Sequence, residues 1–177
     1  MSKIVYYVAS SIDGYISGLN EDISGFVQAG SGVEQYLNDL SSFETVIMGR
    51  RTYEFGYQYG LQPGQPAYLH MEHYIFSKSL TFDNPHPKVQ TKALRIEEID
   101  EIRQHSRTDI YLCGGGIFAG WLLEHQQIDV IKLKLNPFIA GQGIKLFENT
   151  QKNYQLHLLQ NELFDKGLQI LTYEVNY

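Results

Sequence analysis

The sequence predicts an α/β fold built on one mainly parallel sheet that ends in an antiparallel hairpin. Short apolar, β-branched runs alternate with helical patterns along the chain, which is typical of parallel strands joined by right-handed crossovers. The last stretch, residues 154–175, holds two long strand patterns around Asp165-Lys166-Gly167, which indicates a hairpin. No repeat or linker interrupts the 177 residues, so we expect one domain over residues 1–177.

The first quarter of the chain predicts a strand, a loop and a helix. Residues 3–10, "KIVYYVAS", are β-branched and aromatic, and both faces are apolar at the centre, which favours a central strand. Residues 10–26 are expected to form a long loop, in which Asp13-Gly14 favours a short hairpin. Apolar residues then recur at helical spacing over 32–43.

The middle of the chain begins with a short apolar strand at 44–49. A short helix is expected over 50–60, followed by a Pro/Gly-rich irregular segment at 61–73. Two further strands are expected at 74–77 and, with a weaker pattern, at 88–91.

The next elements repeat the alternation. A one-sided pattern of isoleucines predicts a helix over 95–106, and an apolar strand follows at 109–114. A helix is expected at 116–127 and an alternating strand at 129–139, which stops near Pro137 because proline ends the ladder.

The composition favours a cytoplasmic protein. Cys113 is the only cysteine, which excludes a disulfide framework and fits a reducing compartment. No apolar run reaches the length of a membrane helix, so no membrane partner is expected. The net charge of −6 argues against nucleic acid, which binds to clustered lysine and arginine. No metal site is predicted, because His70 and His73 have no further ligands nearby in the sequence.

Two strand-to-helix junctions, at 46–54 and 111–120, are the candidate binding sites. Ligands of α/β sheets gather at the carboxyl ends of strands, and phosphates bind at helix N-termini. Gly114, Gly115 and Gly116 leave room for a phosphate to approach the backbone, or they make a tight turn that lets two elements pack closely. The spacing fits neither the Rossmann nor the Walker phosphate loop.

The first junction adds positive charge. Arg50, Arg51 and Thr52 follow a strand directly, and arginine forks suit phosphate oxygens. The alternative is a pair of solvated arginines on a surface helix. Because both junctions occur in one chain, a dinucleotide with several phosphates is the economical explanation.

Several motifs together resemble those of a known family. They are "SSIDGYI", "VIMGRRTYE", "IFSKSL", "DIYLCGGGIFAGWLLEHQQIDVIKL" and "LNPFIAGQGIKLF", in that order. The chain thereby resembles the dihydrofolate-reductase-like superfamily, and within it the bacterial bifunctional deaminase-reductase C-terminal family (RibD C-terminal-like), over nearly its whole length. The resemblance implies a three-layer α/β/α fold with a twisted sheet, and NADPH as the cofactor.

The resemblance also implies positions for the cofactor. The 2′-phosphate and pyrophosphate are expected at Gly49, Arg50, Arg51 and Thr52, with Ser77 and Lys78 beside the adenosine phosphate. The pyrophosphate and nicotinamide ribose are expected at Gly114, Gly115, Gly116, Ile117 and Phe118. The nicotinamide pocket is expected at Val8 and Ala9, under the loop at 11–16.

Two acids are candidates for catalysis. Dihydrofolate reductases carry a pterin-orienting acid on the first helix, which aligns here with Val33 or Glu34. Val33 is the better match, so Glu34 is either the neighbour of that position or a solvated residue. Asp13 is expected beside the cofactor and the substrate ribose, or as a turn residue. Tyr7 stands where riboflavin-pathway reductases carry a lysine.

The resemblance implies an NADPH-dependent reductase of a small heterocyclic or carbonyl-type substrate. The activity resembled is that of 5-amino-6-(5-phosphoribosylamino)uracil reductase of riboflavin biosynthesis. Dihydrofolate reductase activity and a non-catalytic NADPH-binding regulatory protein remain the alternatives. A homodimer is expected from the family and from the apolar, strand-rich C-terminus.

Overall fold

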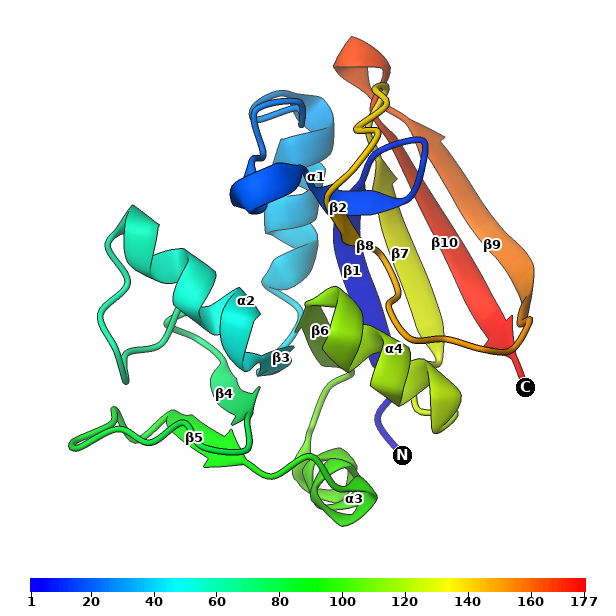
Figure 1. Ribbon diagram of the computed structural model, residues 1–177. Coiled ribbons are helices and arrows are strands. Elements are labelled where there is room, and N and C mark those ends of the chain that lie inside the picture. Colours follow the sequence, from blue (N-terminus) through cyan, green and yellow to red (C-terminus); the bar gives the residue numbers. More distant parts are fainter.

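The main sheet has eight strands in the order β5-β4-β3-β6-β1-β7-β10-β9, in a computed structural model that describes residues 1–177 (Figure 1). Strand β10 runs antiparallel to β7 and β9, and the neighbouring strands from β5 to β7 are parallel. The strands are β1 (Ile4–Ser10), β3 (Thr45–Gly49), β4 (Glu72–Phe76), β5 (Val89–Lys92), β6 (Ile110–Gly114), β7 (Val130–Leu135), β9 (Gln155–Leu163) and β10 (Gln169–Asn176). The predicted fold class is confirmed, including the C-terminal hairpin.

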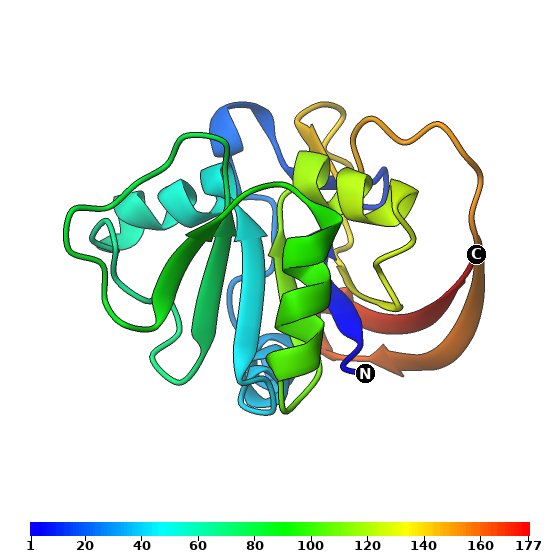
Figure 2. The same cartoon turned by 90° about the horizontal axis from the view of Figure 1, so that it is seen from below.

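Helices cover both faces of this sheet. They are α1 (Ser31–Leu40), α2 (Arg50–Phe55), α3 (Ile96–His105) and α4 (Gly116–Glu124). Short 3₁₀ turns lie at Leu19–Glu21, Gly56–Tyr59 and Asp165–Gly167. Figure 2 shows the twisted sheet with β4 and β5 at one end and β9 at the other. No helix has the length and apolar character needed to cross a bilayer.

Two apolar cores, one on each face, explain the double-sided pattern of β1. Ile4 and Tyr6 are fully buried in the core under α3 and α4. Val5 and Tyr7 enter the opposite core, against α1 and α2. Because successive side chains of a strand point to opposite faces, only a strand covered on both sides has this composition. The central position predicted for β1 is therefore confirmed.

The loop after β1 differs from the prediction. The turn at Asp13-Gly14 forms, with the Gly14 N–H donating to the Ser11 carbonyl at 3.2 Å. The strand that follows, β2 (Tyr15–Ser17), pairs antiparallel with β8 (Ile144–Lys145), so the expected local hairpin is wrong. Pairing between segments this far apart in the sequence leaves no periodic signal.

Strand β9 leaves an apolar edge uncovered. It is an end strand of the sheet, and four of its leucines are 43–75% exposed: Leu156, Leu158, Leu159 and Leu163. An edge that is long, apolar and unpaired is suited to pairing with another chain. The homodimer expected from the sequence would bury this edge.

Charging this edge should disrupt that dimer. We expect the double variant Leu156→Lys/Leu158→Lys to sediment as a monomer at concentrations where the wild type is dimeric, because lysines block edge-to-edge pairing. Analytical ultracentrifugation measures this. Leu69→Lys, at a residue that is 80% exposed and lies outside the strand, is the control and should not change the mass. A wild type that is monomeric at every concentration would contradict the dimer.

Candidate functional site

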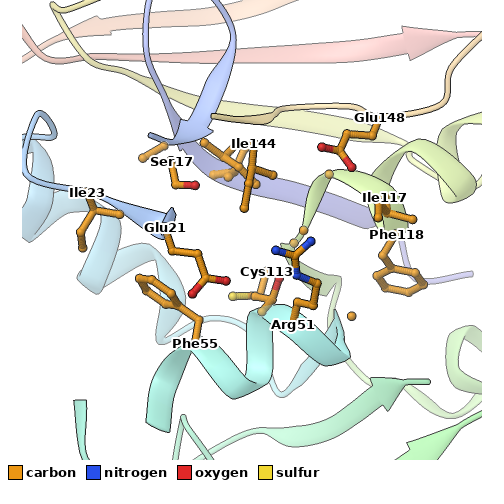
Figure 3. Close-up of a pocket in the computed structure, with 18 of the residues that line it drawn as sticks. Ser17, Glu21, Ile23, Arg51, Phe55, Cys113, Ile117, Phe118, Ile144 and Glu148 are labelled. Atoms are coloured by element: carbon orange, nitrogen blue, oxygen red, sulfur yellow. The ribbon is translucent and has the colours of Figure 1, made fainter. Parts of the chain in front are cut away.

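A cavity of about 560 Å³ opens at the carboxyl ends of β1, β3, β4 and β6. Both strand-to-helix junctions singled out in the sequence line it (Figure 3). The cavity is lined by every residue that the sequence assigned to a cofactor: Val8, Ala9, Gly49, Arg50, Arg51, Thr52, Ser77, Lys78, Gly114, Gly115, Gly116, Ile117 and Phe118. The structure thus brings these segments together on one surface.

The two junctions touch each other. A Cβ placed on Gly115 would lie 3.0 Å from the Thr52 Oγ1, and one on Gly49 would lie 3.3 Å from the Phe118 Cβ. Gly114 has a φ of +137°, a backbone conformation that favours glycine, and its peptide bond to Gly115 is cis. Any larger residue at these glycines would occupy the space between the junctions.

The third glycine serves the alternative purpose, close packing. A Cβ on Gly116 would lie 2.2 Å from the Lys145 carbonyl oxygen, and one on Gly120 would lie 1.9 Å from that of Glu148. The Glu148 N–H donates to the Gly116 carbonyl at 3.0 Å. These glycines, one turn apart on α4, let the segment after β8 lie directly on the helix backbone. Gly114 and Gly115 therefore line the cavity, and Gly116 lets residues 144–148 pack against α4. Because Ile144 and Glu148 also line the cavity, residues 144–148 are called its roof segment.

Cations gather at the α2 end of the cavity. Arg50 is already paired, because its Nε lies 2.8 Å from Glu54 Oε1 and its Nη1 donates to Ser79 Oγ at 3.3 Å. Arg51 and Lys78 are exposed and make no ion pair with the protein. Figure 3 shows the Arg51 side chain extending from α2 into the cavity. Two unpaired cations there are free to receive an anionic ligand.

The side of the cavity facing α1 is lined by aromatic rings. Tyr36 and Tyr111 share a hydrogen bond of 2.7 Å between their hydroxyls. The Cys113 sulfur lies 3.7 Å from the Tyr68 hydroxyl, and burial raises the pKa of its thiol. A thiol with a raised pKa is a poor nucleophile at neutral pH, so the environment of Cys113 favours a packing role.

Two lysines of β7 point toward α1 with different surroundings. Lys132 forms an ion pair with Asp39. Lys134 lines the cavity, and its Nζ lies 3.5 Å from the centroid of the Tyr36 ring. Burial lowers the pKa of Lys134 to about 8, and the nearby Cys113 partly offsets this. The cavity therefore contains an ammonium group without a carboxylate partner.

The structure does not place the two candidate acids in the cavity. Asp13 is exposed and holds two loops together, because its carboxylate accepts from Ser11 Oγ at 2.6 Å and from the N–H groups of Ala140 and Gly141 at 2.9 and 2.7 Å. These hydrogen bonds, led by that from Ser11, lower its pKa to about 2. Glu34 is exposed on α1 and is not among the lining residues. Tyr36, two residues later, is the α1 side chain at the cavity.

Other lining residues were not found from the sequence. Glu21 enters from the 3₁₀ turn after β2 and Glu148 from the segment after β8, and both carboxylates are visible in Figure 3. The apolar lining includes Ile16, Ile23, Phe26, Val27, Phe55 and Ile144. The two glutamates lie in irregular segments, whose position depends on tertiary packing. No three His, Cys, Asp or Glu side chains are grouped so that they could hold a metal ion.

Comparison with known proteins gives consistent matches over the whole chain. Residues 2–170 match the RibD C-terminal domain family. The chain is 23% identical over 184 residues to the uncharacterized protein YyaP of Bacillus subtilis (strain 168), with 98% of this chain and 95% of YyaP covered.

The fold recurs among solved structures. A putative riboflavin biosynthesis protein from Shewanella sp. PV-4 is similar with a TM-score of 0.81 at 19% identity, over 100% of both chains. Dihydrofolate reductase from Enterococcus faecalis, complexed with NADP(H) and RAB-propyl, is similar with a TM-score of 0.67 at 14% identity, over 99% of this chain and 97% of that one. The fold is thus dihydrofolate-reductase-like, and because the family match runs from β1 into β10, the chain belongs to the RibD C-terminal domain family.

Proposed function

We propose that the protein is an NADPH-dependent reductase of a small, flat heterocyclic or carbonyl-type compound. The observation that carries this proposal is the convergence of both junctions on one cavity with unpaired cations at one end and an aromatic half facing α1. A dinucleotide matches both parts of this cavity, because its phosphates suit the cations and its flat nicotinamide ring suits the aromatic side. Membership of the RibD C-terminal domain family supports the same activity.

The residues present fit the cofactor. Gly114 and Gly115 line the cavity without side chains, so a phosphate in the cavity can approach their backbone. Arg51 and Lys78 supply unpaired charge, and Val8 and Ala9 give an apolar wall at the end of β1. Bound NADPH supplies a hydride. The protein contributes by aligning the two rings and excluding water.

The narrower assignments have less support from this cavity. Tyr7 takes the place of the lysine of riboflavin-pathway reductases, and its hydroxyl donates to Asp39 at 2.9 Å. For dihydrofolate reduction, α1 brings a tyrosine and no acid to the cavity. The absence of Asp13 and Glu34 from the lining also favours, as a second candidate, a protein that binds NADPH without turnover.

Thermal unfolding tests the cofactor. At an NADPH concentration of 100 times Kd, the free energy of unfolding should rise by about 2.7 kcal/mol. For a chain of this size that raises Tm by roughly 5–11 °C. NADH at the same concentration should give a smaller shift, because it lacks the 2′-phosphate that the cations receive. No shift with either nucleotide would overturn the proposal.

Turnover separates the two candidates. Oxidation of NADPH in the presence of a panel of pterins, pyrimidines and quinones, followed by absorbance, is expected for at least one compound of a reductase. NADPH binding without oxidation by any member of the panel would favour the non-catalytic candidate.

A further inference from the structure

The two lysines of β7 give an internal comparison. They lie two residues apart on one strand, so both side chains leave the sheet on the α1 face. Lys132 meets Asp39, which also accepts from Tyr7 and Gln35, so this carboxylate is fully engaged. Lys134 makes no ion pair; its Nζ lies over the Tyr36 ring, and the residue lines the open cavity.

The surroundings of Lys134 offer it no negative partner. Its strand neighbours in register are Ala9 on β1 and Ile170 on β10, neither of which is charged. The titratable groups near it are Tyr36 from α1 and Cys113 from β6, and the next acid on this face of the sheet is Glu162 of β9, one strand beyond Ile170 and not in an ion pair with Lys134. Glu21 and Glu148 line the same cavity but form no ion pair with it. A partly buried ammonium without a counter-charge lowers stability, so its presence in a cavity points to a ligand.

We propose that Lys134 is the substrate-binding cation of this cavity and that it selects flat ring compounds with an ionised oxygen. The inference deepens the proposed function, on which its link to turnover rests. The ring of such a compound suits the walls formed by Tyr36, Phe55 and their apolar neighbours. The oxygen anion supplies the charge that Lys134 lacks, in a site where partial burial strengthens the ion pair.

The pH dependence follows from the same contact. Binding of the anion requires the ammonium form, so affinity should be constant below about pH 7 and should fall as pH rises through about 8. A neutral analogue of the same shape should show no such step. Arginine at this position stays protonated, so Lys134→Arg should remove the step near pH 8 and keep the preference for the anion.

The experiment compares 2-hydroxy-1,4-naphthoquinone, an anion at neutral pH, with the uncharged 2-methoxy-1,4-naphthoquinone. Dissociation constants are measured by calorimetry from pH 6 to pH 9.5, on protein loaded with NADP⁺ so that no reduction occurs. The wild type should bind the anion at least about tenfold more tightly than the neutral compound. Lys134→Met, which keeps the apolar stem against Tyr36, should lose this preference and the pH step.

Controls and contrary outcomes keep the test decisive. Lys145→Met removes an exposed lysine next to the lining residue Ile144 and should behave as the wild type. Tm values no lower than that of the wild type show that each variant is folded. Equal anion preference in the wild type and Lys134→Met, or no binding of the anion to the wild type, would overturn the proposal.

A nucleotide titration distinguishes this failure from that of the proposed function. NADPH stabilisation is measured on the same proteins without quinone, and quinone binding is repeated without nucleotide. Loss of the nucleotide effect alone would overturn the reductase proposal and leave the role of Lys134 standing. Loss of the anion preference alone would overturn the role of Lys134 and leave the reductase proposal standing.

Discussion

Gly120→Ala is expected to destabilise the protein by about 3 kcal/mol, although alanine is the better helix former by about 1 kcal/mol. The new Cβ would lie 1.9 Å from the Glu148 carbonyl oxygen, so the segment after β8 must move. That segment is anchored, because the Leu146 carbonyl accepts from the Tyr6 hydroxyl at 3.0 Å and the Leu146 N–H donates to the Gly14 carbonyl at 2.9 Å. Thermal and urea unfolding should show Tm lower by about 6–12 °C.

Gly56→Ala is the matched control. This glycine has helical dihedral angles, and the atoms nearest its new Cβ belong to the side chain of Leu61: Cδ2 at 2.8 Å, which can rotate away, and Cβ at 3.2 Å, which needs a shift of only a few tenths of an ångström. We expect a change within about 1 kcal/mol. A Gly120→Ala variant more stable than the wild type would show that helix propensity outweighs the backbone contact, and that the roof segment is free to shift.

Arg51→Ala is expected to weaken NADPH binding about tenfold to a hundredfold. Loss of a charge-assisted hydrogen bond costs about 1.5–3 kcal/mol, and each 1.4 kcal/mol is a factor of ten in Kd. Arg50→Ala should have a smaller effect, because Arg50 is already paired with Glu54. Fluorescence titration with NADPH and NADH measures both. If Arg51 binds the 2′-phosphate, the NADH affinity should change by less than about threefold.

Arg95→Ala is the control for the removal of a surface arginine. Arg95 pairs with Glu98 at 2.7 Å, is 63% exposed in its side chain and, although it follows Leu94, is not itself a lining residue of the cavity. Its removal should leave both nucleotide affinities unchanged. Equal losses for NADPH and NADH in Arg51→Ala would instead place the guanidinium at a phosphate that both nucleotides carry.

Much of the fold could be predicted from the sequence because its determinants are local. The double-sided apolar pattern of β1 and the helical spacing of α3 are each visible within about ten residues. The positions of the two junctions could also be predicted locally, because a strand that is followed at once by a helix places the turn between them at the carboxyl edge of the sheet. For this reason the residues of both junctions line one cavity, whereas Val8, Ala9, Ser77 and Lys78 were expected there from the family resemblance.

The remaining features of the site depend on tertiary contacts. The pairing of β2 with β8 joins residues 15–17 to 144–145, and no periodicity in either segment marks it. The Asp13 carboxylate accepts hydrogen bonds from the N–H groups of Ala140 and Gly141, in a loop far away in the sequence. The motif around Asp13 alone therefore could not reveal that this residue joins two loops. Lys134 was also missed, because its alternation with the apolar residues of β7 predicts a lysine on the polar, solvated face of the strand.

The pairing of β2 with β8 has a consequence for synthesis of the chain. Strand β1 cannot pair in the main sheet until residues 110 and 130 have been synthesised, and β2 cannot pair in its separate two-stranded sheet until residue 144 has been synthesised. Pairings across such long separations form slowly. A ribosome-bound or truncated polypeptide that ends before residue 144 therefore lacks the roof of the cavity, and the nucleotide would recognise only the finished protein.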